Sequence, residues 1–324
     1  MSSLARCRDR LESGFFSVED TVKSYLAWLK TPFWIIVYGW NELTSSFEYG
    51  AFRSAKRGDV KYAMRTKSRF YGVFRSLPDQ SFFSWGDRGR VTSPLLYVTL
   101  TVDPSRISLI GSWKGVGKEF NRWISFLRSK YGKISVVRTW DSHESGFCHV
   151  HALLLFHSRS FSGFYHIRKK GTYRLQSRSE LSIIKSGWKA GFVDVQLCSS
   201  VASAGRYLGK YLTKCCDHSR TDSKGVKTLA LCWIFRKRSF SISGDFLKAH
   251  LDLITGSSNS KEFAVQLRLS GSPIHVSVVK WELFGFYLGD RVGWENFFFM
   301  KLGAQAVSEL ESSEDFVPIS CKRR

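Results

Sequence analysis

ISVVRTWDSHESGFCHVHALLLF, residues 134–156, is the stretch that decides the predicted fold. Its two halves, Ile134 to Trp140 and Phe147 to Phe156, are rich in β-branched and apolar side chains, and the short polar segment DSHESG separates them. Two such runs on either side of a short polar segment are typical of antiparallel strands joined by a turn. We therefore predict a β-hairpin over these residues.

Further elements are predicted on both sides of this hairpin. Before it we expect a buried strand and a helix, and after it a helix, a strand and a last helix: 95–102, 118–131, 181–188, 192–197 and 201–214. This order predicts an α+β fold in which helices pack on an antiparallel sheet. Residues 93–218 would form this core, with a basic, aromatic N-terminal region at 1–92 and a C-terminal accessory region at 219–324.

The net charge points to a polyanionic partner. The chain has 49 Lys and Arg against 27 Asp and Glu, which gives a formal charge of +22. Basic side chains bind nucleic acid by releasing counterions from phosphates, although an anionic membrane surface or solubility alone also explains such a charge. In the N-terminal region, Arg53, Lys56 and Arg57 begin a basic tract that we expect either to contact DNA or to form the solvated face of an amphipathic helix.

Composition excludes several other classes of protein. Hydrophobic residues make up 43% of the chain, which is too many for disorder, yet no apolar run reaches the roughly 20 residues of a membrane span. The first residues show no signal peptide, so we expect a cytoplasmic protein without a membrane partner. The seven cysteines predict reduced thiols rather than a disulfide scaffold.

His149 and His151 are the first candidates for chemistry. They lie two residues apart on a predicted strand, so both imidazoles point to one face and can bind a divalent cation. Asp141, at the end of the partner strand, is placed to supply a third ligand, and His143 and Glu144 compete with it. By itself a His-x-His pair is a weak signal, because such pairs often only make hydrogen bonds within a sheet.

Tyr207 and Tyr211 lie four residues apart on the last predicted helix, so both phenols share one face, with Lys210 and Lys214 close by. A tyrosine is a poor nucleophile at neutral pH unless its phenolate or its target is stabilised, which a lysine and a divalent cation can do. The simpler alternative is a tyrosine face packed on the sheet.

Three segments in this order, YVTLT (97–101), HVH (149–151) and YLGKYLTK (207–214), resemble the three motifs of the HUH replication initiators. The last is similar to the two-tyrosine motif of phage gene A proteins and of plasmid and archaeal initiators. The resemblance covers about 120 residues. It implies a core like that of RNA-recognition and ferredoxin-like domains, and a metal-dependent endonuclease that nicks single-stranded DNA to start rolling-circle replication of a plasmid or virus.

The resemblance also implies roles for individual residues. His149, His151 and Asp141 would bind Mg²⁺ or Mn²⁺. Tyr207 and Tyr211 would be the nucleophiles, forming a 5′-phosphotyrosine link, with Lys210 as the motif lysine. The residues expected to face the DNA are Lys214, Thr99 and Thr101. The expected partners are single-stranded or hairpin origin DNA, a host helicase and a host polymerase.

Two other functions remain open at this point. A transposase with the same cut-and-join chemistry would have the same active site, because only the choice of DNA differs. A basic nucleic-acid-binding protein without catalysis would bind DNA with a steep salt dependence and form no covalent product. The ordered set of histidines and tyrosines favours the initiator over both.

Overall fold

A computed structural model describes most of the chain. The residues described are 3–41, 45–59, 62–64, 66, 84–86, 90–165, 173–200, 203–205, 209–210, 223–238, 240–246, 278–288, 299–302, 304–313 and 316–318. The helices are α1 (Ser3–Glu12), α2 (Val18–Lys30), α4 (Leu109–Tyr131), α5 (Arg178–Ser186), α7 (Ser223–Ile234) and α9 (Ala304–Glu311). The strands are β1 (Phe33–Asn41), β2 (Ser46–Arg53), β3 (Ser84–Gly86), β4 (Arg90–Ser93), β5 (Leu95–Val102), β6 (Ile134–Ser142), β7 (Cys148–Phe156), β8 (Phe161–Tyr165), β9 (Tyr173–Leu175), β10 (Gly191–Leu197), β11 (Phe240–Ser243), β12 (Val278–Leu288), β13 (Phe299–Leu302) and β14 (Phe316–Pro318).

The chain forms two compact units, each built from two segments. The first unit comprises residues 1–26 and 57–259, and the second comprises residues 27–56 and 260–324. In the second unit, five strands form a sheet in the order β13-β2-β1-β12-β14. The division into 1–92, 93–218 and 219–324 that we made from sequence patterns stays a prediction.

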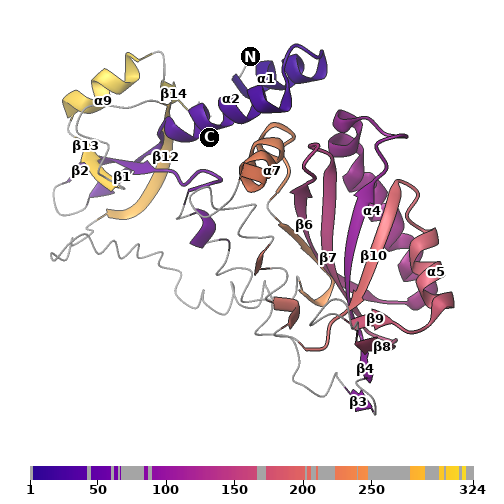
Figure 1. Ribbon diagram of the computed structural model, residues 1–324. Helices are drawn as coiled ribbons and strands as arrows, with labels where there is room; N and C mark the ends of the chain where they lie inside the picture. The colour runs from indigo at the N-terminus through magenta and orange to yellow at the C-terminus, as the bar shows by residue number, and fades with distance from the viewer. Residues whose placement is uncertain are drawn as a thin grey trace. The chain divides into compact units, whose positions relative to one another are not determined.

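The first unit is built on a nine-stranded sheet in the order β11-β6-β7-β5-β10-β9-β8-β4-β3. Every neighbouring pair in this sheet is antiparallel. Helices α4 and α5 lie against one face of its central strands (Figure 1). The α+β fold predicted from the sequence, with helices packed on an antiparallel sheet, is therefore confirmed.

The predicted hairpin is present, with a shorter turn than expected. Strand β6 continues through Asp141 to Ser142, which pair with His149 and Cys148 of β7. The turn itself closes through a hydrogen bond from His143 N to Phe147 O of 2.8 Å. It contains Gly146 at a φ of 89°, a left-handed conformation that glycine adopts without steric cost. As a result Asp141 belongs to the sheet rather than to the turn.

Helix α4 begins nine residues before the predicted start at Lys118. The glycines in this stretch weaken helix propensity, which is why the sequence pattern indicated a later start. Ser108 caps the helix by accepting a hydrogen bond from Gly111 N, and the extra turns bury Trp113 and Val116. Tertiary burial of these two side chains therefore offsets the unfavourable local propensity.

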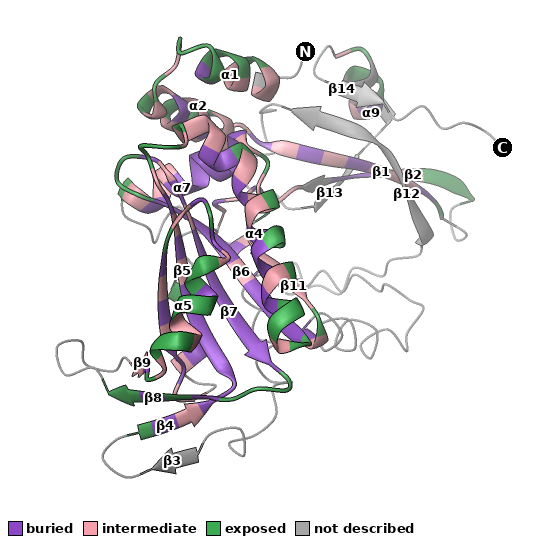
Figure 2. Ribbon diagram, turned by 90° about the vertical axis from the view of Figure 1, so that its right-hand side faces the viewer, coloured by how far each residue is buried: buried purple, intermediate pink, exposed green. Residues whose placement is uncertain are grey.

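The two faces of the sheet have different compositions. Alternate residues of β5, β7 and β10 join side chains of α4 and α5 in a large apolar cluster, which includes Leu100, Val150, Val195, Trp123 and Ile184. Figure 2 shows these central strands as largely buried beneath the helices. The opposite face has a smaller apolar cluster at one end. The polar candidates lie at the other end of that face.

Two further expectations can be compared with the described residues. None of the described helices is long and apolar enough to cross a bilayer. Cys7, Cys148, Cys198 and Cys232 are reduced thiols, as predicted, and the other cysteines lie outside the described residues.

Candidate functional site

Three neighbouring strands position the candidate residues of the sheet. In the register of β5, β7 and β6, Thr99 pairs with His151, while Thr101 pairs with His149, which pairs in turn with Asp141. Directly paired residues of adjacent strands point to the same face, and so do residues two apart along one strand. All five side chains therefore lie on the face opposite α4 and α5.

His149 has an unusual electrostatic environment. Its Nε2 atom is buried and has no hydrogen-bond partner among the described residues. Burial lowers the pKa of His149 to about 4, and the neighbouring His151 and His143 lower it as well, while Asp141 acts in the opposite direction. The imidazole is therefore neutral at physiological pH, which is the form that can bind a metal ion.

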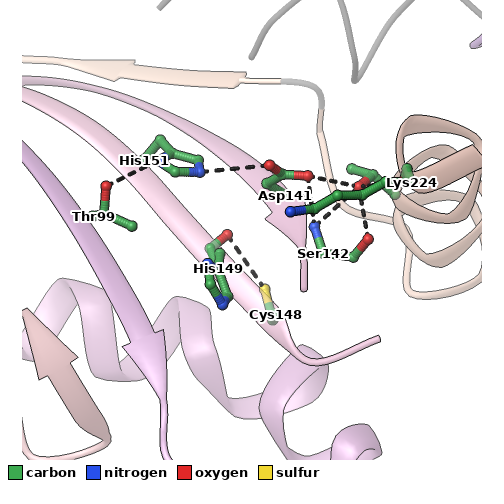
Figure 3. Close-up of polar contacts among 8 residues, drawn as sticks. Thr99, Asp141, Ser142, Cys148, His149, His151 and Lys224 are labelled. Atoms are coloured by element: carbon green, nitrogen blue, oxygen red, sulfur yellow. Dashed lines mark hydrogen bonds and ion pairs between the residues drawn. The ribbon is translucent and has the colours of Figure 1, made fainter. Parts of the chain in front are cut away.

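His151 is held between two polar groups. Its Nδ1 lies 3.2 Å from Thr99 Oγ1, and its Nε2 lies 3.6 Å from Asp141 Oδ2. Both His151 and Asp141 are almost fully buried, at 4% and 3% exposure. Thr99 thus orients the ring so that the other ring nitrogen faces the carboxylate, as Figure 3 shows.

Helix α7 fixes the carboxylate of Asp141 from the other side. Thr228 Oγ1 donates a hydrogen bond of 2.8 Å to Asp141 Oδ1, and Ser142 N donates one of 2.9 Å to the same oxygen. Thr228 Oγ1 also lies 2.8 Å from Ser142 Oγ. These contacts leave Oδ2 on the side of His151, so Thr228 sets the direction in which the carboxylate points.

No sequence pattern indicated α7 or Thr228. The helix lies in the region whose role the sequence left open, and Thr228 stands 87 positions from Asp141. The one local signal is a threonine at the start of the apolar run Thr228 to Ile234, whose members are all buried. Lys224 of the same helix extends towards Asp141 (Figure 3) and acts electrostatically on His149.

The two competitors for the third ligand position lie elsewhere around the turn. The His143 ring stacks on His149 with 5.3 Å between ring centroids, and its Nδ1 lies 2.9 Å from Ser145 Oγ. Glu144 is exposed, and its backbone oxygen accepts a hydrogen bond from Lys227. Asp141 is the carboxylate that faces the histidine pair.

The predicted nucleophiles, Tyr207 and Tyr211, lie outside the described residues, as does Lys214. Lys210, between the two tyrosines, is helical and exposed. The matching of the tyrosine segment to the histidine pair therefore rests on the sequence.

The basic residues of the N-terminal region differ in their surroundings. The side chain of Arg53 lies outside the description, and Arg57 is half-buried. Lys56 is buried at 7% exposure, donates hydrogen bonds to Trp28 O and Thr31 O, and lies 4.6 Å from the centroid of the Trp28 ring. Its ammonium group is committed to the fold, so we do not retain Lys56 as a DNA contact.

The donor set fits a hard divalent cation in chemistry but is not assembled as a centre. Two imidazoles and a carboxylate are ligands that Mn²⁺ accepts, and the buried Nε2 of His149 lacks a partner among the described residues. Within the described part of the chain, however, no group of three His, Cys, Asp or Glu side chains is arranged to hold a metal ion. Asp141 and His151 face each other instead, and a cation would replace that contact.

Comparison with known proteins gives one match. Residues 95–215 match the model of a family of replication-associated proteins, the ORF2 family. This segment contains β5, the hairpin of β6 and β7, and the tyrosine segment, and it ends before α7. No curated protein and no solved structure matches the chain. The similarity supports a replication initiator-like protein.

Proposed function

From the similarity to replication-associated proteins over residues 95–215, we propose that this chain nicks and rejoins single-stranded DNA to initiate rolling-circle replication. The substrate would be a single-stranded or hairpin origin of a plasmid or virus. A host helicase and polymerase would then extend from the nick, since the chain contains no phosphate-binding loop of a motor protein.

One observation carries this proposal. On one face of the sheet, a neutral imidazole with a buried, unpartnered Nε2 lies beside a second imidazole that is aligned with a carboxylate. A buried polar atom without a partner costs free energy, so its presence here asks for an explanation. A ligand that His149 binds during function supplies one.

His149, His151 and Asp141 would hold Mg²⁺ or Mn²⁺. When bound, such an ion polarises a non-bridging oxygen of the scissile phosphate and offsets its charge. Thr99 and Thr228 keep His151 and Asp141 in their orientations, and Lys224 adds a positive charge near His149 that suits a phosphate.

The bond changes would then fall to the tyrosines. The phenol oxygen of Tyr207 or Tyr211 forms a bond to phosphorus while the bond from phosphorus to the 3′ oxygen breaks. The phenolic proton passes to solvent, and the leaving 3′ oxygen takes up a proton, so the products are a 5′-phosphotyrosine and a free 3′-hydroxyl. Lys210 would stabilise the phenolate or the phosphate. The second tyrosine is available for the strand transfer that rejoins the DNA.

The test is covalent attachment. The protein is incubated with labelled single strands of random sequence and Mn²⁺, and labelled protein is detected after denaturing electrophoresis. We expect an adduct that EDTA prevents and that a double Tyr207→Phe, Tyr211→Phe variant does not form. The matched control is Tyr165→Phe, which removes the hydroxyl of an exposed tyrosine on β8 and should form the adduct normally.

An adduct that persists in the double tyrosine variant would contradict the assignment of the nucleophiles. A transposase would give the same adduct, so the origin or element end from which the selected strands come would separate it from an initiator.

A non-catalytic DNA-binding protein is the second candidate, and one observation favours it. The described residues form no assembled three-ligand centre. Under this alternative the chain binds single strands with a strong salt dependence, independently of Mn²⁺, and no adduct forms with any strand. The attachment experiment therefore decides between the two candidates.

A further inference from the structure

A single cross-strand row connects the candidate site to an exposed aromatic side chain. Phe192 on β10 pairs with Thr101 on β5, which continues the row of His149 and Asp141. Because paired residues point to the same face, Phe192 lies on the face that carries the histidine pair. Neighbouring strands are about 4.8 Å apart, so Phe192 and His149, two strands apart, are separated by about 10 Å.

Exposure increases along this row. Asp141 is 3% exposed, His149 and Thr101 are half-buried, and Phe192 is 65% exposed. The row therefore opens to solvent at β10. A ligand that reaches the buried end at the histidines has an uncovered surface beside it at the other end.

Phe192 has no role in the hydrophobic core. The alternate residues of β10, Val193, Val195 and Leu197, pack into the core on the helix-covered face, whereas Phe192 belongs to neither apolar cluster. A single exposed apolar side chain is common on protein surfaces. This one stands next to the candidate site, on a face where its strand otherwise presents Asp194 and Gln196.

Positive charge lies close to the start of β10. Lys189, three residues before Phe192, is exposed, and the exposed Arg106 donates a hydrogen bond of 3.3 Å to Lys189 O. An exposed ring with cations beside it is the combination that binds single-stranded nucleic acid, since bases stack on the ring and phosphates contact the cations. The overall charge of +22 agrees with a polyanion as the occupant.

We propose that Phe192 stacks on a nucleobase of the single strand whose backbone reaches the histidine pair, which makes the open face of β10 a base-binding position. This inference rests on the proposed function, because that function supplies the single-stranded substrate. Stacking on a ring tolerates every base, so Phe192 contributes affinity and placement of the strand rather than sequence selection.

The experiment measures binding of fluorescein-labelled oligo(dT) by anisotropy in EDTA, so that no cleavage is required. Phe192→Ala weakens binding about tenfold, and Phe192→Trp, which keeps a stacking surface, binds like the unchanged protein. Phe192→Leu retains an apolar side chain without an aromatic face and weakens binding nearly as much as alanine. Phe15→Ala is the matched control, because Phe15 is 83% exposed between α1 and α2, outside the sheet, and its loss leaves affinity unchanged.

Two results overturn the inference. One is equal affinity of the alanine variant and the unchanged protein. The other is a change in oligomeric state with the alanine variant, measured by light scattering, which would make Phe192 a contact between copies of this chain. A protein that shows the Phe192 effect but forms no covalent adduct contradicts the nicking chemistry alone. An adduct without the Phe192 effect contradicts only the base-binding position.

Discussion

The two faces of the nine-stranded sheet use the same strands for different purposes. On the face under α4 and α5, β7 contributes Val150, Ala152 and Leu154 to a continuous apolar cluster. On the other face the same strand contributes His149 and His151, one of them with a buried polar atom that lacks a partner among the described residues. The first face stabilises the fold, and the second carries groups whose arrangement costs stability.

Alternation along a strand therefore separates stability from chemistry at a distance of one residue. A substitution on the helix-covered face should lower the free energy of unfolding in every condition. A substitution on the site face should act mainly on ligand binding. Four changes test that separation, and the one with the largest expected effect comes first.

Trp123→Ala should be the most destabilising change. Trp123 is fully buried on α4, and its Nε1 donates a hydrogen bond of 2.9 Å to Ile184 O. Loss of the indole leaves a cavity and an unpaired carbonyl, which lowers the free energy of unfolding by about 3–5 kcal/mol. Urea denaturation measures the effect. Lys118→Ala on the same helix is the control, and a loss below about 1 kcal/mol for Trp123→Ala would break the assignment of this face.

A double His149→Ala, His151→Ala variant should act on metal binding instead. Removal of residues that only support a metal ligand costs about 10- to 100-fold in affinity, so removal of two ligands should cost more than about 100-fold. Isothermal titration with Mn²⁺ measures this loss, while urea denaturation in EDTA should show no comparable destabilisation. Replacement of the exposed His143 by alanine is the control. Unchanged Mn²⁺ affinity in the double variant would remove the metal from the proposal.

The low pKa of His149 predicts a dependence of stability on pH. Its pKa is about 4 in the folded protein against an ordinary value of 6.5. The unfolded chain therefore binds the proton first as the pH falls below 6.5, and stability decreases until about pH 4. Between about pH 7 and pH 5 the loss should be about 2 kcal/mol. Urea denaturation in EDTA should show a smaller loss for His149→Gln, and an equal loss in both proteins would contradict the burial of this imidazole.

Thr228→Val should have the smallest effect of the four. Valine keeps the shape of the threonine but removes the hydrogen bond to Asp141 Oδ1, while Ser142 N still holds that oxygen. We therefore expect about a tenfold loss of Mn²⁺ affinity, at the low end of what supporting residues contribute. Thr228→Ser keeps the hydroxyl and should restore the affinity. Equal affinity of the valine and serine variants would show that Thr228 does not position Asp141.

Much of the fold was predictable because the signals are local. The buried strand at 95–102 and the hairpin follow from runs of β-branched residues, and each is confirmed. The start of α4 was misplaced, because three glycines obscure a helix that burial of Trp113 and Val116 stabilises. Helix α7 was not predicted at all, and its eight buried residues from Gly225 to Ile234 become intelligible only through packing on β6.

The candidate site was predictable to a smaller extent. The spacing of His149 and His151 indicated a shared face, and the structure places Asp141 opposite His149 in the register. Lys56 was misjudged, since a basic tract suggests exposure and this side chain is buried against Trp28 and Thr31. A lysine that donates to carbonyls of a preceding helix and loop has no distinctive sequence pattern.

Local sequence was enough to establish which chemical groups are present and which of them share a face of one strand, because that alternation depends only on neighbouring residues. The pairing of the strands came from the three-dimensional fold, and with it the row formed by Asp141, His149, Thr101 and Phe192. The hold of Thr228 on the carboxylate came from the same source. Such contacts join residues far apart in the chain, and their free energy comes from the packing of whole elements rather than from any local pattern.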